Sequence, residues 1–143
     1  MSNAIEKAAE IIRGRTAFGT YEDNKYCVLA QEDIDGGLTA SVLTPAKAEG
    51  VKWLTFCTGL GSNKAKRIER DSRAAVCFDS ESYSITLKGR LEILTDMESK
   101  REHWYDGMGN HFSDYDDPNY CVLRFHTEKY SLFVDWEETT GTL

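Results

Sequence analysis

Short apolar segments, each bounded by Gly, Pro, Asn or Asp, recur along most of this chain. Runs rich in β-branched and apolar residues with such boundaries are typical of β-strands. They predict an extended piece over 16–21 and strands over 25–31, 38–45, 53–58, 74–78, 83–94, 120–125 and 129–133, followed by a polar tail. Gly89 interrupts the longest run, which indicates a bulge, a bend or a closely approaching backbone. Because most connections are too short for a crossover, we expect a largely antiparallel sheet curled into a barrel or sandwich.

Helical spacing of apolar residues is confined to three short segments. The first is predicted over 3–14, where Asn3 and Glu6 form a capping box. The second starts at Ser62, directly after a glycine turn. The third opens at a capping box of Thr95 and Glu98 and ends at glycines 107 and 109. The chain is therefore expected to be mainly β with short helices.

The junction between the strand at 53–58 and the helix at Ser62 is suited to an anion. Backbone amides in the first turn of a helix lack intrahelical partners and lie at the positive end of its dipole. Thr58 and Ser62 add hydroxyl groups there, and Lys64 adds a cation. Further basic residues follow at Lys66, Arg67, Arg70 and Arg73, and we expect those on the helix to form its solvated face.

Composition limits the possible functions. The chain has 143 residues, so we expect one domain over 1–143. No apolar run approaches the roughly 20 residues of a membrane helix, and no signal peptide is evident, so a soluble, cytoplasmic protein is expected. The net charge of −7 argues against nucleic acid and anionic membranes as partners. The four cysteines and three histidines show no metal-ligand spacing, so no metal site is predicted.

Three motifs in order resemble one known family. The first is the segment from Phe56 to Ala65, which fits an aromatic-x-Thr-x-x-x-Ser-x-Lys pattern. The second is Lys88 to Glu92, similar to a Gly-x-x-Glu strand. The third is Trp104, Phe112 and the Asp-Asp-Pro-Asn-Tyr run at 116–120. Together they resemble the pyridoxamine 5'-phosphate oxidase-like proteins, an FMN-binding split-barrel family, and within it the general stress protein branch.

This resemblance implies a six-stranded antiparallel split β-barrel of Greek-key type, working as a homodimer with two FMN molecules between the subunits. The implied phosphate contacts are Thr58, Ser62 and Lys64, with Asn63 at a position where the oxidases use arginine. The other implied FMN contacts are Ser41, Val42, Leu43 and Thr44 along the ring and ribityl chain, Phe56 and Cys57 beside the flavin, and Ser84 in place of a flavin-contacting glutamine.

Departures from the family pattern bear on function. The arginine that many relatives carry in the strand at 40–44 is absent, and Asn63 and Ser84 are weaker ligands than the residues they replace. The arginine-rich C-terminal segment of true oxidases is also not seen, so pyridoxamine phosphate oxidase activity is not expected. The sequence favours a flavin-dependent oxidoreductase acting on a small molecule, with no catalytic side chain identified. The alternative is a non-catalytic protein that binds or senses a flavin or another phosphorylated ligand.

Overall fold

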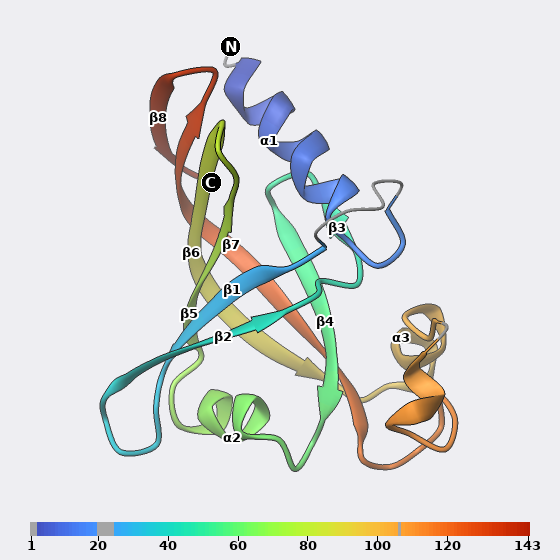
Figure 1. The fold of residues 1–143 in the computed structure, drawn as a ribbon. Coiled ribbons are helices and arrows are strands. Elements are labelled where there is room, and N and C mark those ends of the chain that lie inside the picture. The colour runs from blue at the N-terminus through green and yellow to red at the C-terminus, as the bar shows by residue number, and fades with distance from the viewer. Residues whose placement is uncertain (1–2, 20–24, 106) are drawn as a thin grey trace.

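The computed structural model describes residues 3–19, 25–105 and 107–143. Helices lie near both ends of a curled sheet (Figure 1). In chain order the elements are α1 (Asn3–Gly14), β1 (Cys27–Glu32), β2 (Leu38–Leu43), β3 (Ala48–Glu49), β4 (Trp53–Gly59), α2 (Asn63–Arg70), β5 (Arg73–Asp79), β6 (Tyr83–Leu94), α3 (Met97–Glu102), the short 3-10 helix η1 (Met108–Asn110), β7 (Tyr120–Val134) and β8 (Glu137–Thr142).

The strands form one antiparallel sheet in the order β2-β1-β5-β6-β7-β4-β3. β7 pairs with β6 along its length, with β4 over its first half and with β8 over its second half. After β2 the chain returns beside β4, where the Ala46 amide donates to the Thr55 carbonyl at 2.7 Å and the Thr55 amide donates to the Lys47 carbonyl at 2.9 Å. These bonds bring the two ends of the strand order together and curl the sheet into a barrel.

The inward-facing residues of the strands form the core of this barrel. α1 adds Ala8 and Ile12 to it, and α2 lies at the opposite end of the barrel with Ala65 buried (Figure 1). The largest fully buried apolar side chains of the strands are Leu29, Leu54, Phe56, Val76, Phe78, Ile85, Leu87, Leu123, Phe125 and Leu132. Within the described residues, no helix is both long and apolar enough to cross a membrane.

Of the alternatives predicted for Gly89, the structure shows a bulge together with a closely approaching backbone, that of His126 and Thr127. The β6–β7 register pairs Lys88 with Lys129 but Gly89 with Thr127, so Glu128 is an extra residue on β7. The prediction of two separate strands over 120–125 and 129–133 is wrong, because both segments belong to the single strand β7. The polar residues between them form the bulge of that strand and do not form a turn.

Other sequence predictions fail at element ends. Residues 137–142 form β8, reached through a turn in which Asp135 and Trp136 have φ values of 54° and 65°. No glycine marks this turn, so its reversal is not evident from the sequence. The N-cap of α3 is Asp96 and not Thr95, since the Asp96 carboxylate accepts from the Ser99 amide at 3.0 Å. α3 ends at Glu102, before the predicted end at glycines 107 and 109. Residues 16–19 of the predicted extended piece form turns, and residues 20 and 21 lie outside the described residues.

Candidate functional site

The turn between β4 and α2 is held in place by a residue that sequence reasoning missed. Asn119 accepts from the Leu60 amide with its carbonyl at 2.6 Å and from the Gly61 amide with its side chain at 3.2 Å. A side chain on Gly59 would place its Cβ 2.8 Å from Asn119 Nδ2, so a larger residue there would displace the Asn119 side chain that holds the turn. Asn119 lies in the run at 116–120, whose turn pattern gave no sign of a contact with the distant glycines.

Several hydrogen-bond donors of this turn are uncommitted. Ser62 is the N-cap of α2 and accepts from the Ala65 amide at 3.2 Å, which leaves its hydroxyl hydrogen for a ligand. Across residues 3–19, 25–105 and 107–143, the structure gives no hydrogen bond to the Asn63 or Lys64 amide and no ion pair to the Lys64 ammonium. The predicted helix start at Ser62 is therefore confirmed, with Ser62 as the N-cap, and the free donors of the first turn fit an anion.

A buried glutamine fixes the first turn of α2 from inside the barrel. Gln31 of β1 is 4% exposed, and its Nε2 donates to the Lys64 carbonyl at 3.1 Å. This bond ties the backbone of Lys64 to the sheet, so the amides at the start of α2 are held by a rigid element. The strand position of Gln31 gave no signal for this role.

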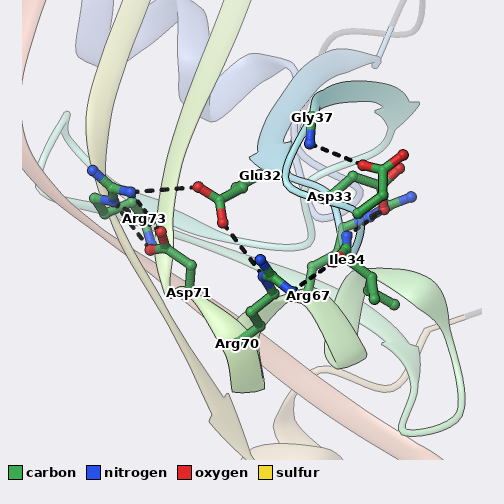
Figure 2. Close-up of polar contacts among 9 residues, drawn as sticks. Glu32, Asp33, Ile34, Gly37, Arg67, Arg70, Asp71 and Arg73 are labelled. Carbon is green, nitrogen blue, oxygen red and sulfur yellow. Dashed lines mark hydrogen bonds and ion pairs between the residues drawn. The ribbon is translucent and has the colours of Figure 1, made fainter.

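The solvated face predicted along α2 is wrong for Arg67, whereas Arg70, whose side chain is 51% exposed, lies on the solvated side as predicted. Arg67 Nε lies 3.1 Å from Asp33 Oδ1, and the Arg67 side chain is only 12% exposed. Arg70 donates to the Ile34 carbonyl at 2.6 Å and pairs with Glu32 at 3.4 Å. Figure 2 shows both arginines reaching the hairpin between β1 and β2. That hairpin folds against the helix, a contact that helical periodicity cannot reveal.

Arg73, the last basic residue of the segment, is also paired. It donates to Asp71 at 2.6 Å and lies 3.6 Å from Glu32, whose carboxylate it shares with Arg70 (Figure 2). Hydrogen bonds from the Arg73 side chain and backbone lower the pKa of Asp71 to about 2. Of the five basic residues of this segment, Lys64 and Lys66 are therefore the two without an ion pair among the described residues.

The predicted flavin-side residues of β2 lie on a strand at the edge of the sheet. β2 pairs with β1, with Val42 opposite Val28 and Ser41 opposite Leu29. The side chain of Val42 is 65% exposed, whereas Ser41, Leu43 and Thr44 are half-buried. This arrangement leaves the surface of β2 accessible to a ligand or to another protein.

Two predicted residues of β4 point in opposite directions. Phe56 is fully buried in the core, so its side chain is unavailable to a ligand and only its backbone can make a contact. Cys57 faces α3, where its Sγ lies 3.7 Å from the Tyr120 hydroxyl and 3.6 Å from the His103 carbonyl. Burial raises the pKa of the Cys57 thiol to about 12, which keeps it protonated and unreactive at neutral pH. Thr58 follows at the half-buried end of β4, next to the turn.

Ser84 lies far from the β4–α2 turn in the same chain. It is exposed near the start of β6 and pairs with Phe133 of β7, whereas Thr58 pairs with Cys121. Phe133 and Cys121 are twelve residues apart on one strand, or roughly 40 Å at about 3.3 Å per residue. One chain therefore brings Thr58, Ser62, Asn63 and Lys64 together but leaves Ser84 apart from them.

Comparison with known proteins gives the family. A family model described as pyridoxamine 5'-phosphate oxidase like matches residues 16–142, and the chain belongs to this family. No match was found among functionally curated proteins.

Solved structures show the same fold. General stress protein 26 from Bacillus anthracis strain Sterne is 19% identical with a TM-score of 0.80, and the match covers 99% of this chain and 100% of that one. A pyridoxamine 5'-phosphate oxidase-related, FMN-binding protein from Nostoc punctiforme is 18% identical with a TM-score of 0.57, covering 82% and 86%. A heme-binding protein from Mycobacterium smegmatis is 16% identical with a TM-score of 0.71, covering 99% and 59%. The predicted mainly β, antiparallel split-barrel fold is thus confirmed.

Proposed function

We propose that this protein binds FMN at the β4–α2 turn and acts as a flavin-dependent oxidoreductase on a small molecule. The observation that carries the proposal is the set of free donors at the start of α2. Two backbone amides, the Ser62 hydroxyl and the Lys64 ammonium have no competing acceptor among the described residues. A dianionic phosphate group satisfies such donors and gains from the helix dipole. The FMN-binding relative from Nostoc punctiforme shares the fold and supports this choice of ligand.

The protein residues have defined tasks in this proposal. Bound FMN supplies hydride or electron transfer through its isoalloxazine ring. Ser62, Lys64 and Thr58 anchor the phosphate, and Asn119 and Gln31 keep the turn in its binding conformation. The half-buried surface of β2 excludes water from one side of the ring. The protonated thiol of Cys57 acts only in packing.

The proposed protein is a homodimer with the cofactor shared between subunits. Ser84 and Ser62 are separated by roughly 40 Å of strand in one chain, far more than the length of one FMN, so both contact the same FMN only if they come from different subunits. An apolar surface is available for a second copy, since Leu38 is 92% exposed and Val42 is 65% exposed on the edge strand β2. The four free cysteines fit the reducing environment of the cytoplasm.

A second candidate function is binding or sensing of a flavin without turnover. It is favoured by Asn63, which is exposed beside the phosphate turn where oxidases use arginine, and by the unreactive Cys57 thiol. A heme ligand, suggested by the relative from Mycobacterium smegmatis, has less support at this turn because the turn offers donors for an anion and no histidine. Reduction of bound flavin by a nicotinamide cofactor, followed by its reoxidation with an added acceptor, would favour the oxidoreductase. Bound flavin that is not turned over in this assay would favour the binding or sensing protein.

The first experiment is an absorption spectrum of the protein after incubation with FMN and gel filtration. We expect flavin to elute with the protein, and its absence at all tested concentrations would refute the proposal. A Soret band after parallel incubation with heme, without retained flavin, would favour the other cofactor.

Variants of the turn then locate the phosphate. Ser62→Asn and Ser62→Asp both keep an N-capping side chain, so α2 stays intact in each. We expect Ser62→Asp and Lys64→Gln to weaken FMN by about 10- to 100-fold, the usual effect of losing a bond to a charged group, with little effect on riboflavin. Ser62→Asn has a smaller effect, and the exposed neighbour Lys66→Gln is the matched control. Equal losses for FMN and riboflavin would show that the phosphate lies elsewhere.

A further inference from the structure

One carboxylate organises the loop that precedes β7. Asp117 Oδ1 accepts a hydrogen bond from the Asn119 amide at 2.9 Å. Asp117 Oδ2 accepts from the Ser113 amide at 3.0 Å and from the Ser113 hydroxyl at 3.3 Å. Hydrogen bonds from the amides of Ser113 and Asn119 hold the pKa of the Asp117 carboxyl below its usual value. The carboxylate is therefore charged at neutral pH and ties the two ends of the loop over 113–119 together.

The backbone of Asp117 is anchored to buried parts of the fold. Lys100 of α3 is only 5% exposed, and its ammonium donates to the Asp117 carbonyl at 2.9 Å. The Tyr120 amide donates to the same carbonyl at 3.0 Å, and the Tyr120 hydroxyl donates to the Lys100 carbonyl at 2.8 Å. Tyr120 is itself fully buried at the start of β7. Asp117 is thus held in place relative to both α3 and the sheet.

Only Pro118 separates Asp117 from Asn119, the residue that holds the β4–α2 turn. The proline ring fixes φ at its position, so little conformational freedom remains between the anchored Asp117 and the Asn119 amide. Asn119 accepts from the Leu60 amide with its carbonyl and from the Gly61 amide with its side chain. The course of the chain at residues 60 and 61 therefore depends on the Asp117 carboxylate through Asn119.

Ser62 connects these held residues to the proposed phosphate contacts. It directly follows Gly61, and its own amide donates to the Gly59 carbonyl at 3.0 Å. Its hydroxyl is one of the free donors at the start of α2, and Lys64 follows two residues later. Because a planar peptide bond joins Gly61 to Ser62, a shift of Gly61 also moves Ser62.

We propose that Asp117 is a positioning residue for the phosphate turn and that it acts through Asn119. This inference rests on the proposed function, since the ligand affected is the phosphate group of FMN. It goes further by giving a role to a carboxylate whose two oxygens bond to residues of its own loop. An acidic residue thereby supports the binding of an anion by holding in place the backbone that binds it.

Solvent exchange of backbone amides, measured by NMR in the ligand-free protein, tests the support of the turn. Asp117→Ala removes the acceptor for the Asn119 amide. We expect the Leu60 and Gly61 amides to exchange about 3- to 10-fold faster in this variant, the usual effect of losing one hydrogen bond. Unchanged exchange of both amides would overturn the proposal.

Asp116→Asn is the matched control for this experiment. Asp116 is the exposed neighbour of Asp117, and the structure gives it no ion pair across the described ranges. The control removes the same negative charge, so it reports any general effect of charge on the turn. We expect its Leu60 and Gly61 amides to exchange as in the wild type. Equal acceleration in Asp116→Asn and Asp117→Ala would assign the effect to charge alone and overturn the proposal.

Affinities for FMN and riboflavin separate positioning of the phosphate from general stability. We expect Asp117→Ala to weaken FMN by about 3- to 10-fold and to leave riboflavin near its wild-type affinity. A purely structural role would lower the melting temperature without changing the ratio of the two affinities, and an unchanged ratio would overturn the proposal. Asp117→Asn keeps one acceptor oxygen and is expected to show a smaller change of the same sign. It decides the question alone if Asp117→Ala does not fold.

A double-mutant cycle tests whether Asp117 acts through Asn119. Asn119→Ala removes the side-chain bond to Gly61 and keeps the carbonyl that bonds to Leu60. We expect the loss of FMN affinity in the double variant to be smaller than the product of the two single losses, because the residues share one route to the turn. A loss equal to that product would show independent action and overturn the proposal.

The two kinds of measurement keep this inference apart from the proposed function. Failure of FMN to bind the wild type would refute the proposed function, and faster exchange at Leu60 and Gly61 in Asp117→Ala would still show that Asp117 positions the turn. Equal binding of FMN by the wild type and Asp117→Ala, with unchanged exchange, would overturn this inference and leave the proposed function intact.

Discussion

Replacement of Gly89 by alanine tests the bulge that shapes β6 and β7. A Cβ at this buried position would lie 2.9 Å from the carbonyl carbon and well inside van der Waals contact of the carbonyl oxygen of His126. It would also lie 3.1 Å from the Cα of Thr127. Carbon atoms normally approach to about 3.5–4.0 Å, and all three neighbours are backbone atoms, so no side chain can move aside.

The expected cost follows from this overlap. Overpacking of a core usually costs about 1–3 kcal/mol, and a clash with the backbone of a long central strand belongs at the upper end. Alanine also lowers the conformational entropy of the unfolded chain, which offsets only about 0.4–1 kcal/mol of this cost. With an unfolding entropy of about 2.1 cal/mol/K per residue over 143 residues, a net loss of about 2–2.6 kcal/mol lowers the melting temperature by roughly 7–9 °C.

Thermal unfolding followed by circular dichroism measures this loss. Gly109→Ala is the matched control, because a Cβ at Gly109 meets nothing within 4 Å. We expect the control to melt within about 2 °C of the wild type, as surface substitutions usually do. A melting temperature of Gly89→Ala equal to that of the control would show that the bulge adapts, and would refute the reasoning.

Three further measurements follow from the charges and thiols described above. Asp71, whose pKa is lowered to about 2 from 3.8, stabilises the fold fully above about pH 4 and loses this contribution as the pH falls toward 2. Asp71→Asn is therefore expected to lose less stability than the wild type as the pH falls from about 4 to 2, measured as the melting temperature at each pH. The same loss in both proteins would contradict the contact between Asp71 and Arg73. The half-buried Cys57, whose thiol pKa is raised to about 12, is expected to resist iodoacetamide at neutral pH in the native protein and to react after unfolding. Peptide mass mapping measures the labelling, and rapid labelling of the native protein would show that α3 does not cover the thiol. Lys88→Gln is expected to stabilise the ligand-free protein by about 0.2–1 kcal/mol at low salt by relieving the repulsion from Lys129, and a loss of stability would contradict that repulsion.

Local signals in the sequence predicted the parts of the fold that depend on neighbouring residues. The strand before the glycine turn, the helix start at Ser62 and the irregularity at Gly89 each depend on a few adjacent residues, and each is confirmed. The single strand over 120–134 was missed because polar residues at its centre resemble a turn, although they occupy the bulge.

Contacts between distant segments were beyond sequence reasoning. Arg67 has the spacing of a solvated helix position, and its burial depends on Asp33 of a hairpin more than thirty residues away. Asn119 is likewise distant in sequence from the glycines that it holds. The separation of Ser84 from Ser62 follows from strand register along β7, which no local motif encodes.

Two adjacent residues of β1 contact the two ends of α2 in different ways. The Gln31 side chain points into the barrel and holds the Lys64 carbonyl, whereas Glu32 contacts Arg70 of α2 and Arg73 of β5 (Figure 2). A displacement of this strand would move both contacts at once. β1 therefore supports the start of α2 through Gln31 and joins Arg70 to Arg73 through the Glu32 carboxylate that the two arginines share.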